Sequence, residues 1–213
     1  MDAQYPPTRA QISLQELWET QSPRDFKIIT GQGEVIEVHK EIMCRYCPRL
    51  AELIEAEGED YLQIWFPTVV LWELVAHLYG FDFNYRFGEP DHATEYLNDF
   101  FVAAREFELP DFWSLAEDAV CHLVMCYDRV QCFCFGALLF SDYDADSVPA
   151  SIMDLTVKRT AANLDSITAE EREEILRNHF PCRPDMVEKF AAHVSEYAAA
   201  MSLASGIEQI HMT

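Results

Sequence analysis

Cysteine pairs are the first residues of this 213-residue chain whose spacing could support chemistry. Cys44 and Cys47 form a Cys-x-x-Cys motif, which serves redox exchange when it begins a helix after a strand, because the helix terminus stabilises a thiolate. A zinc site would need a second pair, for which Cys132-x-Cys134 is the candidate. Since the first pair falls inside a predicted helix, we expect buried and unreactive cysteines instead.

Acidic and nucleophilic patterns are also incomplete. Asp142-x-Asp144-x-Asp146 begins like a calcium-binding EF-hand loop. That loop needs Gly at its sixth position and Glu at its twelfth, where this chain has Ser147 and Met153. The seven histidines are scattered, and no Gly-x-Ser-x-Gly motif occurs. We therefore expect no EF-hand, no hydrolase site, no metal and no cofactor.

The elements that position these residues begin with a predicted β-hairpin. Residues 26–30 and 35–40 resemble two short strands around Gly31-Gln32-Gly33. Because this turn joins strands and does not precede a helix, it does not predict a phosphate-binding loop. A helical pattern then runs from Glu41 to Gly58, and a further strand is predicted over 61–66.

Most of the remaining chain has apolar residues at helical spacing or helix-capping patterns. Ser13-x-x-Glu16 and Thr168-x-x-Glu171 are capping boxes, which mark helix starts. A short edge strand is predicted at Tyr85-Arg86-Phe87, and the region after residue 128 is helical throughout. The separate helices are predicted over residues 14–20, 70–79, 95–108, 110–123, 148–163, 168–178 and 184–200.

Large aromatic residues and one histidine supply candidate core positions. Trp65, Trp72 and Trp113 fall within the predicted elements, so they are expected in the core. His39 is expected to be a buried histidine with its hydrogen bonds satisfied. Trp18 precedes the first strand and is the candidate for an exposed anchor that contacts a partner.

The charge of the chain narrows the classes of partner. It carries 37 acidic against 15 basic residues, a net charge of −22. Nucleic acid and anionic membranes attract clustered Lys and Arg, so neither is an expected partner. The first residues lack the features of a signal peptide, and no apolar run of about 18 residues occurs. With seven cysteines and no secretory signal, a cytoplasmic or nuclear location is expected.

A set of landmarks along the first half of the chain resembles the BTB/POZ domain in order and spacing. The landmarks are Asp25, Val38-His39-Lys40, residues 44–50, Leu78-Tyr79-Gly80, residues 103–110 and Leu115-Ala116-Glu117. The helical remainder is similar to the tail of BTB proteins from filamentous fungi. The resemblance implies an α+β class with the BTB/POZ fold, a small β-sheet flanked by a helical cluster, and an all-α C-terminal extension. The implied divisions are an N-terminal extension with a short helix (1–24), a BTB/POZ domain (25–128) and a helical extension (129–213).

The resemblance implies a non-enzymatic module for protein–protein interaction that forms homo- or hetero-oligomers. In the family, the Asp at position 25 and the basic residue after His39, here Lys40, lie in a charged pocket near the dimer interface. The alternative to this charged pocket is that Asp25 is an ordinary Asp at the start of a strand and that Lys40 is an exposed Lys.

Phe87-Gly88-Glu89 resembles the element through which BTB adaptors engage cullin-3 in a ubiquitin ligase. A turn with a core Phe87 and a solvated Glu89 is favoured over this, because so short a pattern arises often by chance. A scaffold that does not bind cullin is a second hypothesis for the whole protein. A small helical enzyme that depends on a thiol or a metal is the third.

Overall fold

The chain folds as an α+β protein with a small sheet and many helices. Contacts divide it into two compact units: unit 1 comprises Met1–Tyr85 and Asp99–Ala116, and unit 2 comprises Arg86–Asn98 and Glu117–Thr213. This division falls before residue 128, where the sequence places the end of the first domain. The structure, a computed structural model, describes residues 9–20, 23–83, 85, 90–142, 148–179 and 184–211.

The sheet of unit 1 has the order β2-β1-β3. Strands β1 (Phe26–Ile29) and β2 (Val35–Val38) form the predicted antiparallel hairpin, and β3 (Tyr61–Gln63) lies parallel to β1. Gly33 has a φ of 81° in the turn, a backbone conformation that glycine adopts without strain. The hairpin is confirmed, whereas the strand predicted over 61–66 ends three residues earlier.

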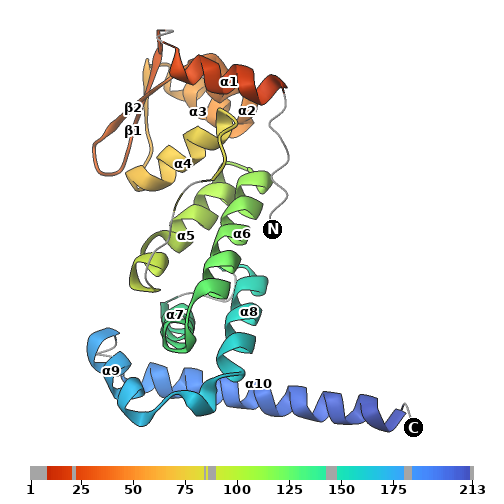
Figure 1. Ribbon diagram of the computed structural model, residues 1–213. Helices are drawn as coiled ribbons and strands as arrows, with labels where there is room; N and C mark the ends of the chain where they lie inside the picture. The colour runs from red at the N-terminus through yellow and green to blue at the C-terminus, as the bar shows by residue number, and fades with distance from the viewer. Residues whose placement is uncertain are drawn as a thin grey trace. The chain divides into compact units, whose positions relative to one another are not determined.

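Helices of unit 1 gather beside this sheet (Figure 1). The single helix predicted from Glu41 to Gly58 is wrong, because Cys47 is extended and separates two helices. Pro48 causes this break, since a proline disfavours helical dihedrals in the preceding residue and suits a first helical position itself. The helices are α1 (Arg9–Glu19), α2 (Lys40–Tyr46), α3 (Pro48–Glu57), α4 (Thr68–Leu78), α5 (Pro90–Glu106) and α6 (Pro110–Cys126), of which the last two continue into unit 2.

The predicted helix ends agree with the structure at some positions and not at others. α1 begins at Arg9, so Ser13 lies inside the helix and the predicted capping box there is wrong. α4 stops just before Gly80, as predicted, where a φ of 78° ends the helical path. Tyr85 has no regular structure, and the other two residues of the predicted edge strand, Arg86 and Phe87, lie outside the described residues.

The core of unit 1 is mainly aliphatic on the sheet, where Phe26 is the aromatic member, and aromatic between the helices. Alternate residues of β1 and β2 are buried, which gives the hairpin one apolar face. Aromatic rings of α5 and α6 meet directly, since the Phe100 and Phe112 centroids are 6.2 Å apart. The largest fully buried side chains of the unit are Tyr79, Phe26, Phe100, Phe101, Phe112, Ile28, Ile36, Met43 and Leu50.

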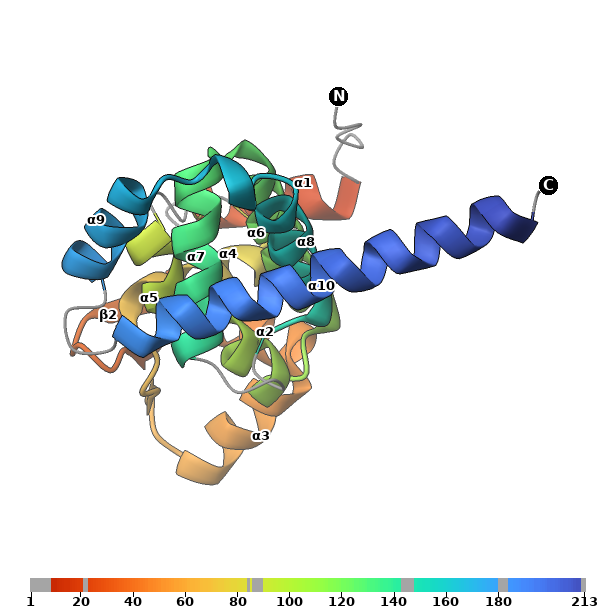
Figure 2. The ribbon, with the colours of Figure 1, turned by 90° about the horizontal axis from the view of Figure 1, so that it is seen from below.

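Unit 2 packs four helices, α7 (Arg129–Asp142), α8 (Ala150–Ala161), α9 (Ala169–His179) and α10 (Pro184–His211), around one apolar cluster. Figure 2 shows α10 running as a long rod beside α7 and α8. At the contact, the ring centroids of Phe133 and Phe190 are 5.5 Å apart, and a Cβ at Gly136 would overlap the Phe190 ring. Among the described residues, no helix is both long and apolar enough to cross a membrane. The 3-10 turn η1 (Leu164–Ser166) lies between α8 and α9 in the chain.

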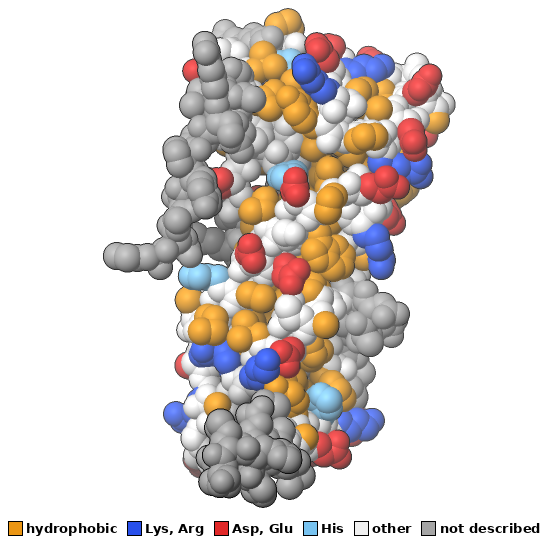
Figure 3. All heavy atoms as spheres, turned by 90° about the vertical axis from the view of Figure 1, so that its right-hand side faces the viewer, with side chains coloured by type: hydrophobic (Ala, Val, Ile, Leu, Met, Phe, Trp, Pro, Cys, Tyr) orange, Lys and Arg blue, Asp and Glu red, His pale blue; other side chains and the backbone are white. Residues whose placement is uncertain are grey.

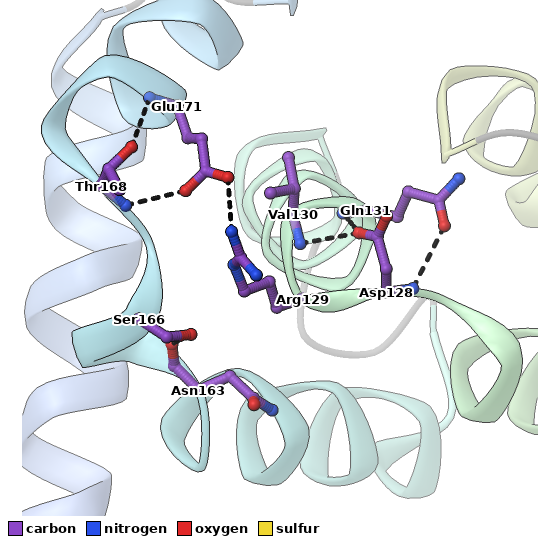
Figure 4. A network of polar contacts seen from close by, with 8 residues as sticks. All are labelled: Asp128, Arg129, Val130, Gln131, Asn163, Ser166, Thr168 and Glu171. Carbon is purple, nitrogen blue, oxygen red and sulfur yellow. Dashed lines mark hydrogen bonds and ion pairs between the residues drawn. The ribbon is translucent and has the colours of Figure 1, made fainter.

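Helix α7 begins with a reciprocal cap that the sequence analysis missed (Figure 4). The Asp128 carboxylate accepts hydrogen bonds from the backbone N–H groups of Val130 and Gln131, both at 2.8 Å. The Gln131 side chain accepts one from the Asp128 N–H at 3.1 Å. The Asp-x-x-Gln spacing therefore satisfies backbone donors that the first turn of a helix leaves free.

Helix α9 begins with the capping box that the sequence predicts. The Thr168 N–H donates to Glu171 Oε2 at 2.8 Å, and the Glu171 N–H donates to Thr168 Oγ1 at 3.1 Å. Arg129 Nη2 also donates to Glu171 Oε1 at 2.7 Å, which joins the starts of α7 and α9 (Figure 4). The bonds from Thr168 and Arg129 hold the pKa of the Glu171 carboxyl below its usual value.

Candidate functional site

Unit 1 contains a groove of about 860 Å³ beside the exposed side chain of Trp65, which we name the Trp65 groove. Residues of α3, of β3 and its connection to α4, and of the C-terminal part of α5 line it. Its volume lies within the range of about 300–1,000 Å³ that is typical of binding pockets. Its apolar lining includes Leu53, Phe66, Val102 and Phe107, and the Phe66 and Phe107 rings lie 6.0 Å apart.

Trp65 is the most exposed large apolar residue among those described, with 79% of its surface accessible. Trp65 is predicted to lie in the core, and this prediction is wrong. Leu62 and Ile64 are buried while Gln63 is exposed, so Trp65 falls on the outward side of the same alternation. The alternation was visible in the sequence and could have identified Trp65 as a surface residue.

The hairpin turn fixes the backbone that carries Trp65. The Gly31 N–H donates to the Phe66 carbonyl at 3.0 Å. A Cβ on Gly31 would lie only 2.6 Å from the Trp65 carbonyl oxygen, so a larger residue does not fit. The Gln32 side chain accepts the Thr68 N–H at 2.9 Å, which caps α4. The turn Gly31-Gln32-Gly33 therefore fixes the backbone of the segment that joins β3 to α4 and carries Trp65.

Carboxylates dominate the charge of the Trp65 groove. Arg49 supplies a guanidinium to the lining, but this group is already paired, since Arg49 Nη1 is 2.6 Å from Glu52 Oε2. Burial raises the pKa of the Asp99 carboxyl, because water solvates its charged form poorly there. The charged residues of the lining are Arg49, Glu57, Asp99, Glu106 and Glu108.

Glu108 occupies a backbone position that favours glycine. Its φ is 55°, and it is the one left-handed residue other than glycine among those described. The Glu108 N–H donates to the Arg105 carbonyl at 3.2 Å, and the Leu109 N–H donates to the Ala104 carbonyl at 2.8 Å. This pair of bonds is the Schellman motif that closes α5, in which the left-handed position is usually Gly.

Of the two cysteine pairs, Cys47, Cys132 and Cys134 are buried as expected, whereas Cys44 is half-buried. Cys47 is fully buried, its thiol donates to the Phe107 carbonyl at 3.5 Å, and burial raises its pKa. Cys132 is buried as well, and desolvation raises the pKa of its thiol. Cys132 and Cys134 lie two apart on α7, so they face different directions. Within the described part of the chain, no three His, Cys, Asp or Glu residues are grouped to hold a metal ion.

The EF-hand-like aspartates lie only partly within the described structure. Asp142 is the last residue of α7. Asp144 and Asp146 lie outside the described residues.

Asp25 and Lys40 are near each other without forming a buried ion pair. Asp25 Oδ1 accepts the backbone N–H of Lys40 at 2.8 Å, so the carboxylate caps α2. The Lys40 ammonium lies 5.6 Å from the centre of the Phe26 ring, within reach of a cation–π contact. Both charged residues are exposed, which agrees with the alternative of a strand-start Asp and an exposed Lys.

His39 is buried, as expected, but only one of its ring nitrogens is satisfied. Its Nδ1 lies 2.7 Å from the Tyr79 hydroxyl, and its backbone N–H donates to the same hydroxyl at 2.8 Å. Its Nε2 is buried and has no hydrogen-bond partner among the described residues. His39 thus connects the start of α2 to the end of α4.

Trp18 is not an exposed anchor, contrary to expectation. It is half-buried, with its ring centroid 4.7 Å from that of Tyr79 and 5.6 Å from that of Trp72. The Arg24 guanidinium covers the same ring at 4.1 Å. Trp72, expected in the core, is 39% exposed, and Trp113 is half-buried.

A smaller hollow of about 260 Å³ in unit 1 is lined by His77 and Asp111, among other residues. Burial lowers the pKa of His77 despite the opposing influence of Asp111, so the imidazole is neutral at neutral pH. The hollow is smaller than typical small-molecule sites. A histidine and a carboxylate therefore share the lining of this hollow.

No protein-family model matches this chain, and no curated protein matches it. The two residues of the cullin-like element, Phe87 and Glu89, lie outside the described residues. The described lining of the Trp65 groove contains no thiol, hydroxyl or imidazole.

Proposed function

We propose that this protein is a non-enzymatic protein–protein interaction module of the BTB/POZ type with a helical C-terminal extension. The observation that carries the proposal is the exposed Trp65 on a fixed backbone, beside a groove with both apolar and acidic lining residues. Tryptophan is enriched among the residues that contribute most to protein interfaces, especially where it can fill a pocket. An indole that is 79% exposed offers apolar surface whose burial against a partner would be favourable.

The order of elements supports the BTB/POZ part of the proposal. A hairpin leads into a helical segment, a third strand joins the same sheet, and helices α4, α5 and α6 follow. This sequence of strand, strand, helix, strand, helix, helix, helix resembles the family's order, with the first helix divided at Cys47 and no strand at Tyr85, while Arg86 and Phe87 lie outside the described residues. The sheet and the cap from Asp25 to Lys40 also agree with that order.

Oligomerisation is the first test of this function. Asp25→Asn keeps an oxygen to cap α2 while it removes the charge, so it separates a dimer contact from folding. We expect light scattering to detect a dimer of the wild-type chain at micromolar concentration, and a weaker dimer for Asp25→Asn and Lys40→Ala. A strict monomer at every concentration, unaltered by either variant, would exclude the dimer.

Cullin binding is the second test. If Phe87 and Glu89 form a cullin-binding element, the immobilised cullin-3 N-terminal region will retain the wild-type chain and will not retain Phe87→Ala or Glu89→Ala. Retention of all three alike would mean that this element does not contact cullin. If the wild-type chain does not bind cullin-3 at micromolar concentration, the proposed function becomes that of a scaffold that does not bind cullin. If the chain is also a strict monomer, the BTB/POZ-type function is overturned.

A further inference from the structure

The Trp65 groove combines an apolar surface with a fixed shape, which a partner could bury without reorganising it. Trp65 stands exposed on a connection that the hairpin turn holds through Gly31 and Gln32. Phe66 and Val102 add apolar surface to the lining. Because this backbone is already ordered, binding there would lose little conformational entropy.

The charges of the same groove favour a cationic occupant. Glu57 lies on α3, Asp99 and Glu106 lie on α5, and Glu108 follows α5, so carboxylates come from both helices. The opposing charge of Arg49 is partly neutralised by Glu52. Burial already raises the pKa of Asp99, and a bound cation would stabilise its charged form.

Other occupants fit these charges less well. A second copy of the chain would bring a net charge of −22 to an acidic groove, and nucleic acid would bring phosphates. A purely apolar segment would leave the carboxylates without a counter-charge. The complementary occupant has basic side chains for the acidic residues and an apolar side chain for Trp65.

We propose that the Trp65 groove binds a short segment of a partner protein in which Lys or Arg side chains flank an apolar side chain. This inference rests on the proposed interaction function and specifies the chemistry of its partner. Trp65 and Phe66 contact the apolar side chain. Asp99, Glu106 and Glu108, which line the same groove, contact the basic ones.

Selection from a random dodecapeptide library displayed on phage tests the composition of the partner segment. The full chain is the bait, and the Trp65→Ala variant serves for counter-selection. We expect the recovered peptides to combine Lys or Arg with Leu, Ile, Phe or Trp. Recovery of acidic peptides, of Lys-only peptides, or of no peptide that prefers the wild type would overturn the inference.

The contribution of single residues to the affinity is tested by fluorescence anisotropy with a dye-labelled form of the best recovered peptide. Trp65→Ala should weaken binding at least about 10-fold, as loss of a buried aromatic anchor does. Glu108→Gly should weaken it about 2-fold to 5-fold, the effect of one exposed charge. The same variant should raise the Tm by about 2–4 °C, because Gly relieves the left-handed backbone.

Controls make each outcome decisive. Trp72→Ala removes a partly exposed tryptophan that does not line the groove, and it should leave the affinity unchanged. A version of the peptide with Glu in place of each Lys and Arg should not bind. Unchanged affinity in both Trp65→Ala and Glu108→Gly would overturn the inference. Dimerisation and cullin binding are assayed separately. A negative result in the peptide-binding assays alone therefore contradicts this inference and not the proposed function.

Discussion

Gly31 and Gly33 meet different physical demands, although they lie two residues apart in one turn. Gly33 has a positive φ but open space around its Cα. Gly31 has no such dihedral, and it lies against the carbonyl groups of Trp65 and Phe66. The first glycine is therefore required for its small size, and the second for its backbone conformation.

Gly31→Ala should destabilise the protein by about 1–3 kcal/mol, because the new methyl group overlaps backbone atoms that cannot rotate away. Gly33→Asn is the matched control, since Asn tolerates the left-handed conformation and the site is open. Urea unfolding of both variants measures the free energies. An equal loss in the free energy of unfolding for the two variants would show that the backbone at Trp65 leaves room for a methyl group at position 31.

Trp18 and Trp65 show where sequence reasoning succeeds and fails at single residues. The outward position of Trp65 follows from strand alternation, which is local and could be predicted. The burial of Trp18 depends on Tyr79 and Trp72, more than 50 positions away in the chain. No local pattern encodes such a contact, so its exposure was predicted wrongly. The acidic lining of the Trp65 groove was also beyond prediction, because it joins α3 to α5.

At the scale of the element, capping determines where helices begin. Thr168 and Glu171 were recognisable because both partners of the cap lie within four residues. The division at Cys47 was readable from Pro48 as well, but the apolar spacing on both sides concealed it. The hairpin and most helices could be predicted for the same reason, because their signals are short in range.

Glu171→Ala should lower the Tm of unit 2 at neutral pH, because it removes one half of the α9 cap and the contact with Arg129. The native fold depresses the pKa of Glu171, so its contribution is present above the unfolded value of about 4.3. That contribution is lost as the pH falls through the lower, folded pKa.

Thermal unfolding monitored by circular dichroism across this pH range measures the effect. The difference in Tm between the wild type and Glu171→Ala should become smaller as the pH falls. Glu170→Ala, at the exposed neighbouring position, is the control and should have a smaller effect at neutral pH. A difference that stays constant down to low pH would mean that the carboxylate charge does not contribute.

At the scale of the whole molecule, the net charge of −22 is the dominant electrostatic feature. On the face drawn in Figure 3, acidic side chains are scattered among apolar and basic ones and do not gather in one patch. Like charges spread over a folded chain repel one another and oppose its compact state.

Added salt should therefore raise the Tm. The screening length falls from about 30 Å at about 0.01 M salt to about 8 Å at about 0.15 M, which weakens this repulsion. Differential scanning calorimetry in NaCl, repeated in choline chloride, measures the change and separates screening from binding of a particular ion. A Tm that is flat or falling over this range would show that self-repulsion does not limit stability.

Helix α1 has a practical consequence for dissecting the protein into fragments. Gln15 on this helix donates to the Gly80 carbonyl at 2.6 Å, and Trp18 lies over Tyr79 at the end of α4. A recombinant fragment that starts at Phe26 would leave these aromatic surfaces open to water, and such fragments tend to aggregate. The shortest well-behaved fragment of unit 1 should therefore start no later than Arg9.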